Sequence, residues 1–257
     1  YYLFNSKGEV IYVGKSDQLR VRIDRHFLST NEKAIALQKE VENIRIEETG
    51  SLLMAEILEH IELMSLKPKY NTPKDKFSLK LGLFTIPSEQ QPLWDIRKIR
   101  HDKPLLLVES LKEGYRWLAE ISKSLKMPVE KIVLPSHING VKKELKKLKN
   151  DFGINLVNQS QKLERPVQAH AILQKLTYPE NQMILIDAGN KIGTNTLYLI
   201  ENYEFIGYSS VALVTDQTNW HLLKKKSTRV DKSVYLNSLI IKSLKDYKIK
   251  PIEFTTA

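Results

Sequence analysis

The chain has 257 residues, 42% of them apolar, and a formal net charge of +10 at neutral pH. This length and apolar content are sufficient for two ordinary domains with buried cores. The chain contains no cysteine, which excludes disulfides, thiolate metal sites and cysteine nucleophiles and is consistent with the reducing cytoplasm.

The positive charge is unevenly distributed along the chain. Residues 1–78 contain twelve basic and twelve acidic side chains, so the whole excess lies in residues 79–257. A basic surface attracts any polyanion without reading its sequence, and a lysine-rich solvated surface has the same composition. No apolar run approaches the ~18 residues that a membrane helix needs, so we expect a soluble, cytoplasmic protein with no membrane partner.

The first elements form a predicted β-hairpin. Two runs rich in tyrosine and β-branched residues, Tyr1–Phe4 and Val10–Val13, flank a turn that contains Gly8. Because Tyr1 already lies in a strand pattern and no methionine precedes it, we expect that an N-terminal segment is missing from this chain.

Three helices and a strand follow the hairpin. Ser16 or Asp17 is expected to cap the first helix, in which Leu19, Ile23 and Phe27 recur at four-residue spacing and predict a buried stripe. The expected bounds are a helix over 18–27, a helix over 32–42, a strand over 43–48 and a helix from Gly50-Ser51 to about 66, which Pro68 ends.

Residues 77–257 are expected to form a second, mixed α/β domain of unknown role. The charged stretch Lys74-Asp75-Lys76 follows a turn and marks the predicted boundary of a first domain at 1–76, and a further division is expected near residue 178. The predicted strands lie at 81–86, 105–108, 131–134, 183–187, 196–200, 205–213, around Trp220 and at 251–254, and the helices at 112–125, 141–150, 165–176 and 233–247. The chain is therefore assigned to the α/β class.

The first domain contains the side chains that phosphodiester hydrolysis requires. Glu59 can hold Mg²⁺ or Mn²⁺ through one carboxylate, with water and phosphate oxygens filling the other positions. Arg22 can meet a phosphate with its guanidinium fork, and Lys15 can add a point charge. Tyr1 and Tyr12 on adjacent strands can direct their hydroxyls into one small space, where a nearby cation would favour a phenol acting as base.

Each of these residues has an ordinary structural interpretation when it is considered singly. A strand tyrosine is usually a packing residue, and a helix glutamate usually faces solvent. The spacing of the set is more specific than packing requires. Ten residues separate the two tyrosines, the arginine follows the lysine by seven positions, and the glutamate precedes Asn71 by twelve.

Residues 1–71 resemble a GIY-YIG nuclease domain, especially the UvrC-type branch that acts in nucleotide excision repair. Tyr12-Val13-Gly14 matches the second half of the family motif, and Tyr1 occupies the final tyrosine of the first half. The resemblance implies an α+β domain in which helices flank a small antiparallel sheet. The matching residues on the helix that follows are Lys15-Ser16, Leu19, Arg22 and His26-Phe27.

The resemblance also implies roles for individual residues. Tyr1 or Tyr12 is the implied general base, with Tyr2 as a lesser rival to Tyr1, and Glu59 is the implied single ligand of Mg²⁺ or Mn²⁺. His26 stands where many UvrC-type members have another tyrosine. The expected catalytic residues are Tyr1, Tyr12, Lys15, Arg22, His26 and Glu59, and the expected DNA contacts in this domain are Lys15, Arg22, Arg25 and Asn71. Outside the resemblance, the DNA contacts expected from a lysine-rich predicted helix are Lys142, Lys143, Lys146 and Lys147, for which a solvated face is the alternative.

The second domain supports weaker inferences. Asp187 ends an apolar strand, which is similar to the first metal-binding aspartate of an RNase H-like fold, but a strand-end aspartate that caps the following turn is the alternative. Residues 79–257 also resemble the C-terminal part of bacterial proteins that place a DnaQ-like 3′→5′ exonuclease before a UvrC-like nuclease. That resemblance implies an upstream exonuclease domain and repair proteins as partners.

The sequence therefore predicts a DNA endonuclease that nicks one strand by metal-assisted hydrolysis in residues 1–71, with residues 79–257 adding DNA affinity or a partner surface. The alternative is a non-catalytic DNA-binding or scaffold protein that has kept a nuclease-like fold.

Overall fold

The computed structural model describes residues 1–71, 81–86, 88, 92–100, 102–133, 168–212 and 219–255. The chain divides into two compact units, and the first unit is discontinuous in sequence. It comprises Tyr1–Phe77, Met183–Lys232 and Lys242–Ala257, whereas the second comprises Ser78–Gln182 and Ser233–Ile241. A boundary at residue 76 with a further division near 178 stays a prediction. No helix in the described ranges is both long and apolar enough to cross a membrane.

The N-terminal hairpin is confirmed and extends to three strands. β1 (Tyr2–Phe4) lies between β2 (Val10–Val13) and β3 (Asn43–Arg45), and both pairings are antiparallel. The hairpin turn is closed by the Asn5 carboxamide, which accepts the N–H groups of Lys7 and Glu9, while Gly8 supplies a φ of 77°.

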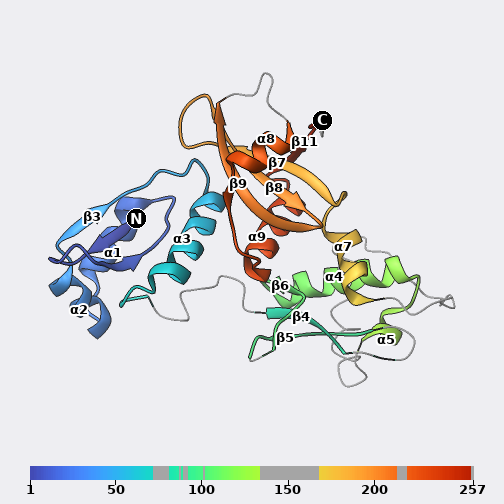
Figure 1. Ribbon diagram of the computed structural model, residues 1–257. Helices are drawn as coiled ribbons and strands as arrows, with labels where there is room; N and C mark the ends of the chain where they lie inside the picture. The colour runs from blue at the N-terminus through green and yellow to red at the C-terminus, as the bar shows by residue number, and fades with distance from the viewer. Residues whose placement is uncertain are drawn as a thin grey trace. The chain divides into compact units, whose positions relative to one another are not determined.

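Two helices, α1 (Leu19–Leu28) and α2 (Glu32–Glu40), pack with this sheet (Figure 1). Leu37 of α2 is buried with residues of β1 and β2, and Leu19 and Ile23 of α1 pack against the same cluster. The expected stripe is wrong at Phe27, which is 42% exposed. A four-residue step advances a helix by about 40° beyond a full turn, so Phe27 lies about 80° around from Leu19.

The cap of α1 also differs from the expectation. Gln18 is the N-cap residue, and the Ser16 hydroxyl accepts the Gln18 N–H before the helix begins.

Helix α3 (Leu52–Leu66) is attached to the sheet through its C-terminal part. Ser51 caps it by accepting the Met54 N–H, and its buried Leu63 packs against Tyr2 and Val13. After the helix ends at Lys67, Tyr70 donates its N–H to the Ile11 carbonyl.

Asn71 then clamps the same strand. Its Oδ1 accepts the Val13 N–H at 2.9 Å and its Nδ2 donates to the Val13 carbonyl at 2.8 Å. The clamp fixes the end of β2 against the segment that follows α3.

The other sheet of the first unit has the strand order β10-β9-β8-β7-β11. The predicted hairpin of its two longest strands is confirmed, with the turn at Asn202 and Tyr203, which both have positive φ. The prediction of a strand around Trp220 is wrong, because Asn219 accepts the Leu222 N–H and starts a helix there. The bounds are β7 (Gln182–Ala188), β8 (Thr194–Glu201), β9 (Glu204–Ala212), α8 (Trp220–Lys226), β10 (Thr228–Arg229) and β11 (Lys250–Ile252).

The second unit contains a three-stranded antiparallel sheet of order β5-β4-β6. The sequence missed β5, whose alternating Asp95 and Arg97 obscured a strand. The strand predicted over 131–134 is wrong, since Pro128 starts a short helix, α5, and only Val133 forms an isolated bridge. The bounds are β4 (Leu81–Ile86), β5 (Leu93–Lys98), β6 (Leu106–Val108), α4 (Leu111–Leu125), α5 (Val129–Ile132) and α7 (Ala169–Thr177), with α9 (Val234–Lys245) running from this unit into the first.

The mixed helical and antiparallel architecture confirms the α/β assignment. The lysine-rich helix predicted over 141–150 lies outside the described residues.

The clamp predicts a structural effect of Asn71. We expect Asn71→Ala to lower the free energy of unfolding by about 1–3 kcal/mol, because two backbone groups of Val13 lose their side-chain partner. Chemical denaturation monitored by circular dichroism measures the change. Asn43→Ala, at an exposed position of β3, is the matched control, and equal stabilities of the two variants would contradict the prediction.

Candidate active site

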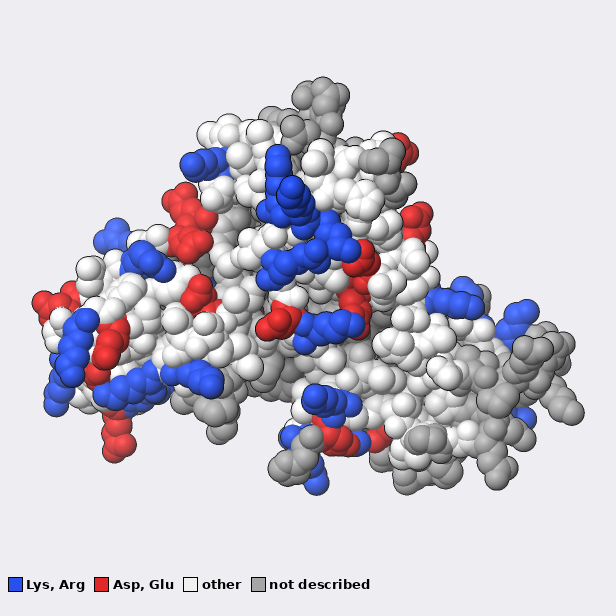
Figure 2. Space-filling view, in the orientation of Figure 1, with Lys and Arg blue, Asp and Glu red and all other residues white. Residues whose placement is uncertain are grey.

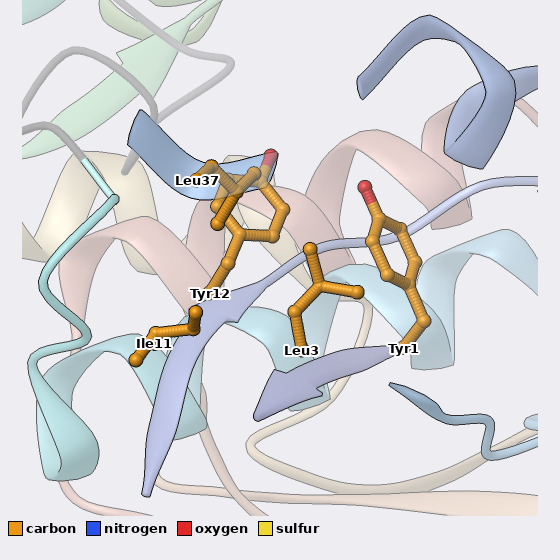
Figure 3. Close-up of a cluster of buried hydrophobic side chains, with 5 residues drawn as sticks. All are labelled: Tyr1, Leu3, Ile11, Tyr12 and Leu37. Carbon is orange, nitrogen blue, oxygen red and sulfur yellow. The ribbon is translucent and has the colours of Figure 1, made fainter. Parts of the chain in front are cut away.

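Two tyrosines and a histidine form a compact cluster on one side of the N-terminal sheet. The Tyr1 and Tyr12 rings stack with centroids 5.9 Å apart, and their hydroxyls point to the same side, with Leu3 between the two residues (Figure 3). The Tyr1 hydroxyl lies 2.7 Å from Nε2 of His26, and the His26 ring meets the Tyr12 ring edge-on at 4.7 Å. The predicted proximity of the two hydroxyls therefore exists, and His26 joins them.

The cluster has a characteristic electrostatic environment. Burial, followed by the neighbouring Tyr12, raises the pKa of the Tyr1 phenol well above its usual value, although Arg22 partly offsets this. Burial, followed by the charges of Arg22 and Lys33, lowers the pKa of His26. A histidine of lowered pKa is neutral at physiological pH, so its Nε2 can accept the Tyr1 hydroxyl proton in a hydrogen bond.

Arg22 approaches the cluster from α1. Its Nη2 donates to the Tyr12 hydroxyl at 3.4 Å, and its side chain is part-buried. Arg25 lies exposed in the last turn of the same helix.

Glu59 and Lys15 meet at the end of β2. The backbone N–H of Lys15 donates to Oε1 of Glu59 at 3.1 Å, and its ammonium pairs with Oε2 of Glu56 at 2.5 Å. Burial raises the pKa of Glu59 to about 6, whereas Lys15 opposes and Glu56 reinforces the shift. Arg22 lies close enough to lower the same pKa, so the phenol cluster and the carboxylate belong to one electrostatic environment.

Gly14 permits the close approach of these groups. The backbone of Gly14 and that of Tyr1 exchange hydrogen bonds at 2.8 and 3.0 Å, one pair beyond the end of β1. A Cβ at Gly14 would lie 2.6 Å from the Tyr1 ring, so a larger residue would displace the phenol. The glycine of the Tyr12-Val13-Gly14 motif is therefore required for a steric reason, because a side chain at this position would collide with the Tyr1 ring.

A cavity of about 470 Å³ opens beside these residues. Its walls include Tyr1, Lys15 and Glu59, together with Glu47 and Asn190, whereas Tyr12, Arg22 and His26 do not line it. The sequence-predicted residues thus form two groups that share Tyr1. Tyr12, Arg22 and His26 surround its ring and hydroxyl, and Lys15 and Glu59 line the cavity with it.

The donor set fits a hard divalent cation at Glu59. One carboxylate oxygen accepts the Lys15 N–H, and the carboxylate borders a cavity with room for water ligands, the arrangement in which proteins usually hold Mg²⁺. The cost of ionising this half-buried group would be offset by a bound cation. Within the part of the chain that the structure describes, no group of three or more acidic or histidine side chains forms a denser metal site.

The remaining predicted residues have other surroundings. The carboxamide of Asn71 is engaged on both sides by Val13, and its contact with DNA stays a prediction. The Tyr2 hydroxyl points to Glu47 at 3.3 Å, and burial followed by Glu47 raises its pKa to about 12, so Tyr2 does not join the Tyr1–Tyr12 pair. Lys142, Lys143, Lys146 and Lys147 lie outside the described residues.

The sequence missed two features of the site. Glu56 anchors the Lys15 ammonium, and its three-residue spacing from Glu59 on α3 was the available signal. Asn190 reaches the cavity from a segment 131 positions after Glu59, and no local pattern predicts that contact.

Comparison with known proteins agrees with this geometry over the N-terminal part of the chain. Residues 1–72 match the family model described as a UvrC-like GIY-YIG domain. No solved structure matches the chain.

Similar curated proteins include three named UvrABC system protein C. The protein from Histophilus somni (strain 2336) is 36% identical over 73 residues, 28% of this chain and 12% of that protein. The protein from Aliivibrio fischeri is 37% identical over 73 residues, with the same coverage of each chain. The protein from Borreliella burgdorferi (strain ZS7) is 33% identical over 105 residues, 40% of this chain and 17% of that protein. The matches thus span less than a fifth of the length of these relatives.

The raised pKa predicts that Glu59 lowers the stability of the fold. Burial raises the pKa of Glu59 from 4.5 in the unfolded chain to about 6 in the folded protein. At a pH above both values, the ionised carboxylate therefore lowers the free energy of unfolding by about 2 kcal/mol. Stability from this group is present below pH 4.5 and is lost as the pH rises through about 6. We expect Glu59→Gln to be more stable than the parent at pH 7.5 without divalent metal, by up to about 2 kcal/mol, and to lose that advantage near pH 4.

Chemical denaturation at the two pH values measures this difference, with Glu62→Gln on the same helix as control. Adding Mg²⁺ should stabilise the parent and leave Glu59→Gln unchanged. Equal stabilities of the parent and Glu59→Gln at pH 7.5 would contradict the prediction.

Proposed function

We propose, from the membership of residues 1–72 in the UvrC-like GIY-YIG family, that this chain is a metal-dependent DNA endonuclease that nicks one strand during nucleotide excision repair. The observation that supports this most directly is the position of Glu59. Its half-buried carboxylate borders a cavity, is held by the Lys15 N–H, and lies in the same electrostatic environment as Arg22.

Each residue of the site has a separate role in the proposed hydrolysis. Tyr12 takes the proton of the attacking water, because its hydroxyl contacts the Arg22 guanidinium, whereas the raised pKa of Tyr1 opposes that role. Arg22 and Lys15 meet the non-bridging oxygens of the phosphate. Tyr1 and His26 hold the Tyr12 ring in place through their ring contacts.

Glu59 holds the divalent cation, Mg²⁺ or Mn²⁺. When bound, the cation supplies Lewis-acid stabilisation of the negative charge that develops on the phosphate. The protein contributes the ligand, the cavity and the fixed orientation of the carboxylate.

Residues 79–257 supply the positive charge for DNA affinity. The N-terminal residues 1–78 are electrically balanced, and Figure 2 shows Lys and Arg side chains gathered over the C-terminal sheet. Lysines on a surface strengthen binding to any phosphate backbone in a salt-dependent manner.

The proposal is tested by nicking of supercoiled plasmid, undamaged and ultraviolet-irradiated, by the full chain with Mg²⁺, Mn²⁺ or chelator. We expect relaxed circles with either cation and none with chelator. Glu59→Gln should abolish nicking and keep most DNA binding, while Glu62→Gln nicks like the parent. A folded parent that binds DNA and leaves every plasmid intact with both cations would sink the proposal.

The assignment of the base predicts different effects of the two tyrosines. Tyr12→Phe should lower the single-turnover nicking rate by about 10²–10⁴-fold, the usual contribution of a general base. Tyr1→Phe should cost less, because it keeps the ring stacking and loses the hydrogen bond to His26. A larger loss in Tyr1→Phe would reverse the assignment.

A further inference from the structure

The β7–β8 hairpin is fastened to the start of α3 by Asp187. The Ser51 hydroxyl donates to Oδ2 of Asp187 at 2.5 Å, and the Tyr198 hydroxyl donates to the same oxygen at 2.8 Å. The Ala188 N–H donates to the other oxygen at 2.8 Å. The carboxylate thus accepts three hydrogen bonds, and its two side-chain donors were not part of either role that the sequence suggested for Asp187.

The backbones of the two segments also touch. A Cβ at Gly50 would lie 2.1 Å from the carbonyl oxygen of Gly189, and Gly50 has a φ of 82°. Contact at this distance is possible only for glycine. The first residue of the hairpin tip therefore lies directly against the residue that precedes the N-cap of α3.

The hairpin tip, residues 189–193, is a closed turn. Gly189 donates its N–H to the Thr194 carbonyl and Thr194 donates its N–H to the Lys191 carbonyl, at 3.1 and 3.0 Å. The Thr194 side chain accepts the Lys191 N–H at 3.1 Å, and Gly193 has a φ of 79°. These bonds fix the backbone of the tip.

The tip carries three exposed side chains in succession, Asn190, Lys191 and Ile192. Asn190 lines the cavity that contains Glu59. Lys191 is exposed and forms no ion pair with the described residues, and Ile192 is fully exposed, at 106%. An amide, a cation and an apolar group in succession suit a partner with polar, anionic and apolar parts.

A nucleotide chain has these parts. Lys15 and Arg22 are the cations assigned to the cleaved phosphate, so the phosphates on either side of it need further cations, and Lys191 is exposed next to Asn190, which lines the cavity. An apolar side chain beside such a cation can pack on a sugar or an unstacked base.

We propose that residues 190–192 are a DNA-binding element of the active site, in which Lys191 binds a phosphate next to the cleaved one and Ile192 packs on the flanking nucleotide. This inference rests on the proposed nuclease function. It adds to the N-terminal residues a substrate contact that comes from the C-terminal sheet.

The absence of cysteine makes a site-specific test practical. Ile192→Cys in the Glu59→Gln background would carry a photoactivatable crosslinker on its thiol, with Tyr247→Cys, 86% exposed, as the matched control. With a duplex whose nick position is known from the parent enzyme, we expect crosslinks within about three nucleotides of the nick from position 192 and at least five-fold fewer from position 247. Crosslinks that are no more frequent than the control, or that lie far from the nick, would overturn the inference.

A second measurement uses the charge. Lys191→Gln should weaken DNA binding by about three- to ten-fold and reduce the slope of log Kd against log salt by about one, whereas Lys39→Gln, at an exposed position of α2, should change neither. Identical behaviour of the two variants would also overturn the inference. A parent that binds DNA and does not nick would contradict the proposed function instead, and the salt slope and the crosslinking ratio would still test the contact.

Discussion

The hydrogen bond from the Lys15 backbone to Glu59 is the contact on which the site depends, because it ties the helix that carries Glu59 to the strand with the tyrosine motif. The fold supports it from both directions. Leu63 packs α3 on Val13, and the segment after the helix returns to the same strand through Tyr70 and Asn71. A shift of α3 along the sheet would separate Glu59 from Lys15 before it disturbed the rest of the core.

The same contact has an electrostatic consequence. Burial raises the pKa of the Glu59 carboxyl group, and the nearby Glu56 carboxylate raises it further. Glu56 also forms an ion pair with the Lys15 ammonium. Ionisation of Glu59 therefore costs free energy that a cation beside the carboxylate would offset.

Local patterns predicted much of the N-terminal part, and contacts across long sequence separations explain what they missed. The hairpin turn at Gly8, the cap at Ser51 and the stop at Pro68 are short-range signals, and the corresponding elements formed as expected. The strand expected at 131–134 turned out to be a helix turn because Pro128 decided the local backbone, and Phe27 was exposed because helical periodicity drifts over two steps. Asp187 shows most clearly what local patterns cannot predict, since its hydrogen-bond partners Ser51 and Tyr198 cannot be inferred from the residues beside it.

The bond between Ser51 and Asp187 joins residues 136 positions apart, and this separation matters for the order in which the molecule is assembled. A ribosome adds about 5–20 residues each second, so many seconds pass between the synthesis of the two partners. During that interval the helix that carries Glu59 has left the ribosome with its cap residue in place and its outer support still untranslated. The segment that matches the family model and the compact unit that contains it therefore differ, because the unit also includes Met183–Lys232 and Lys242–Ala257.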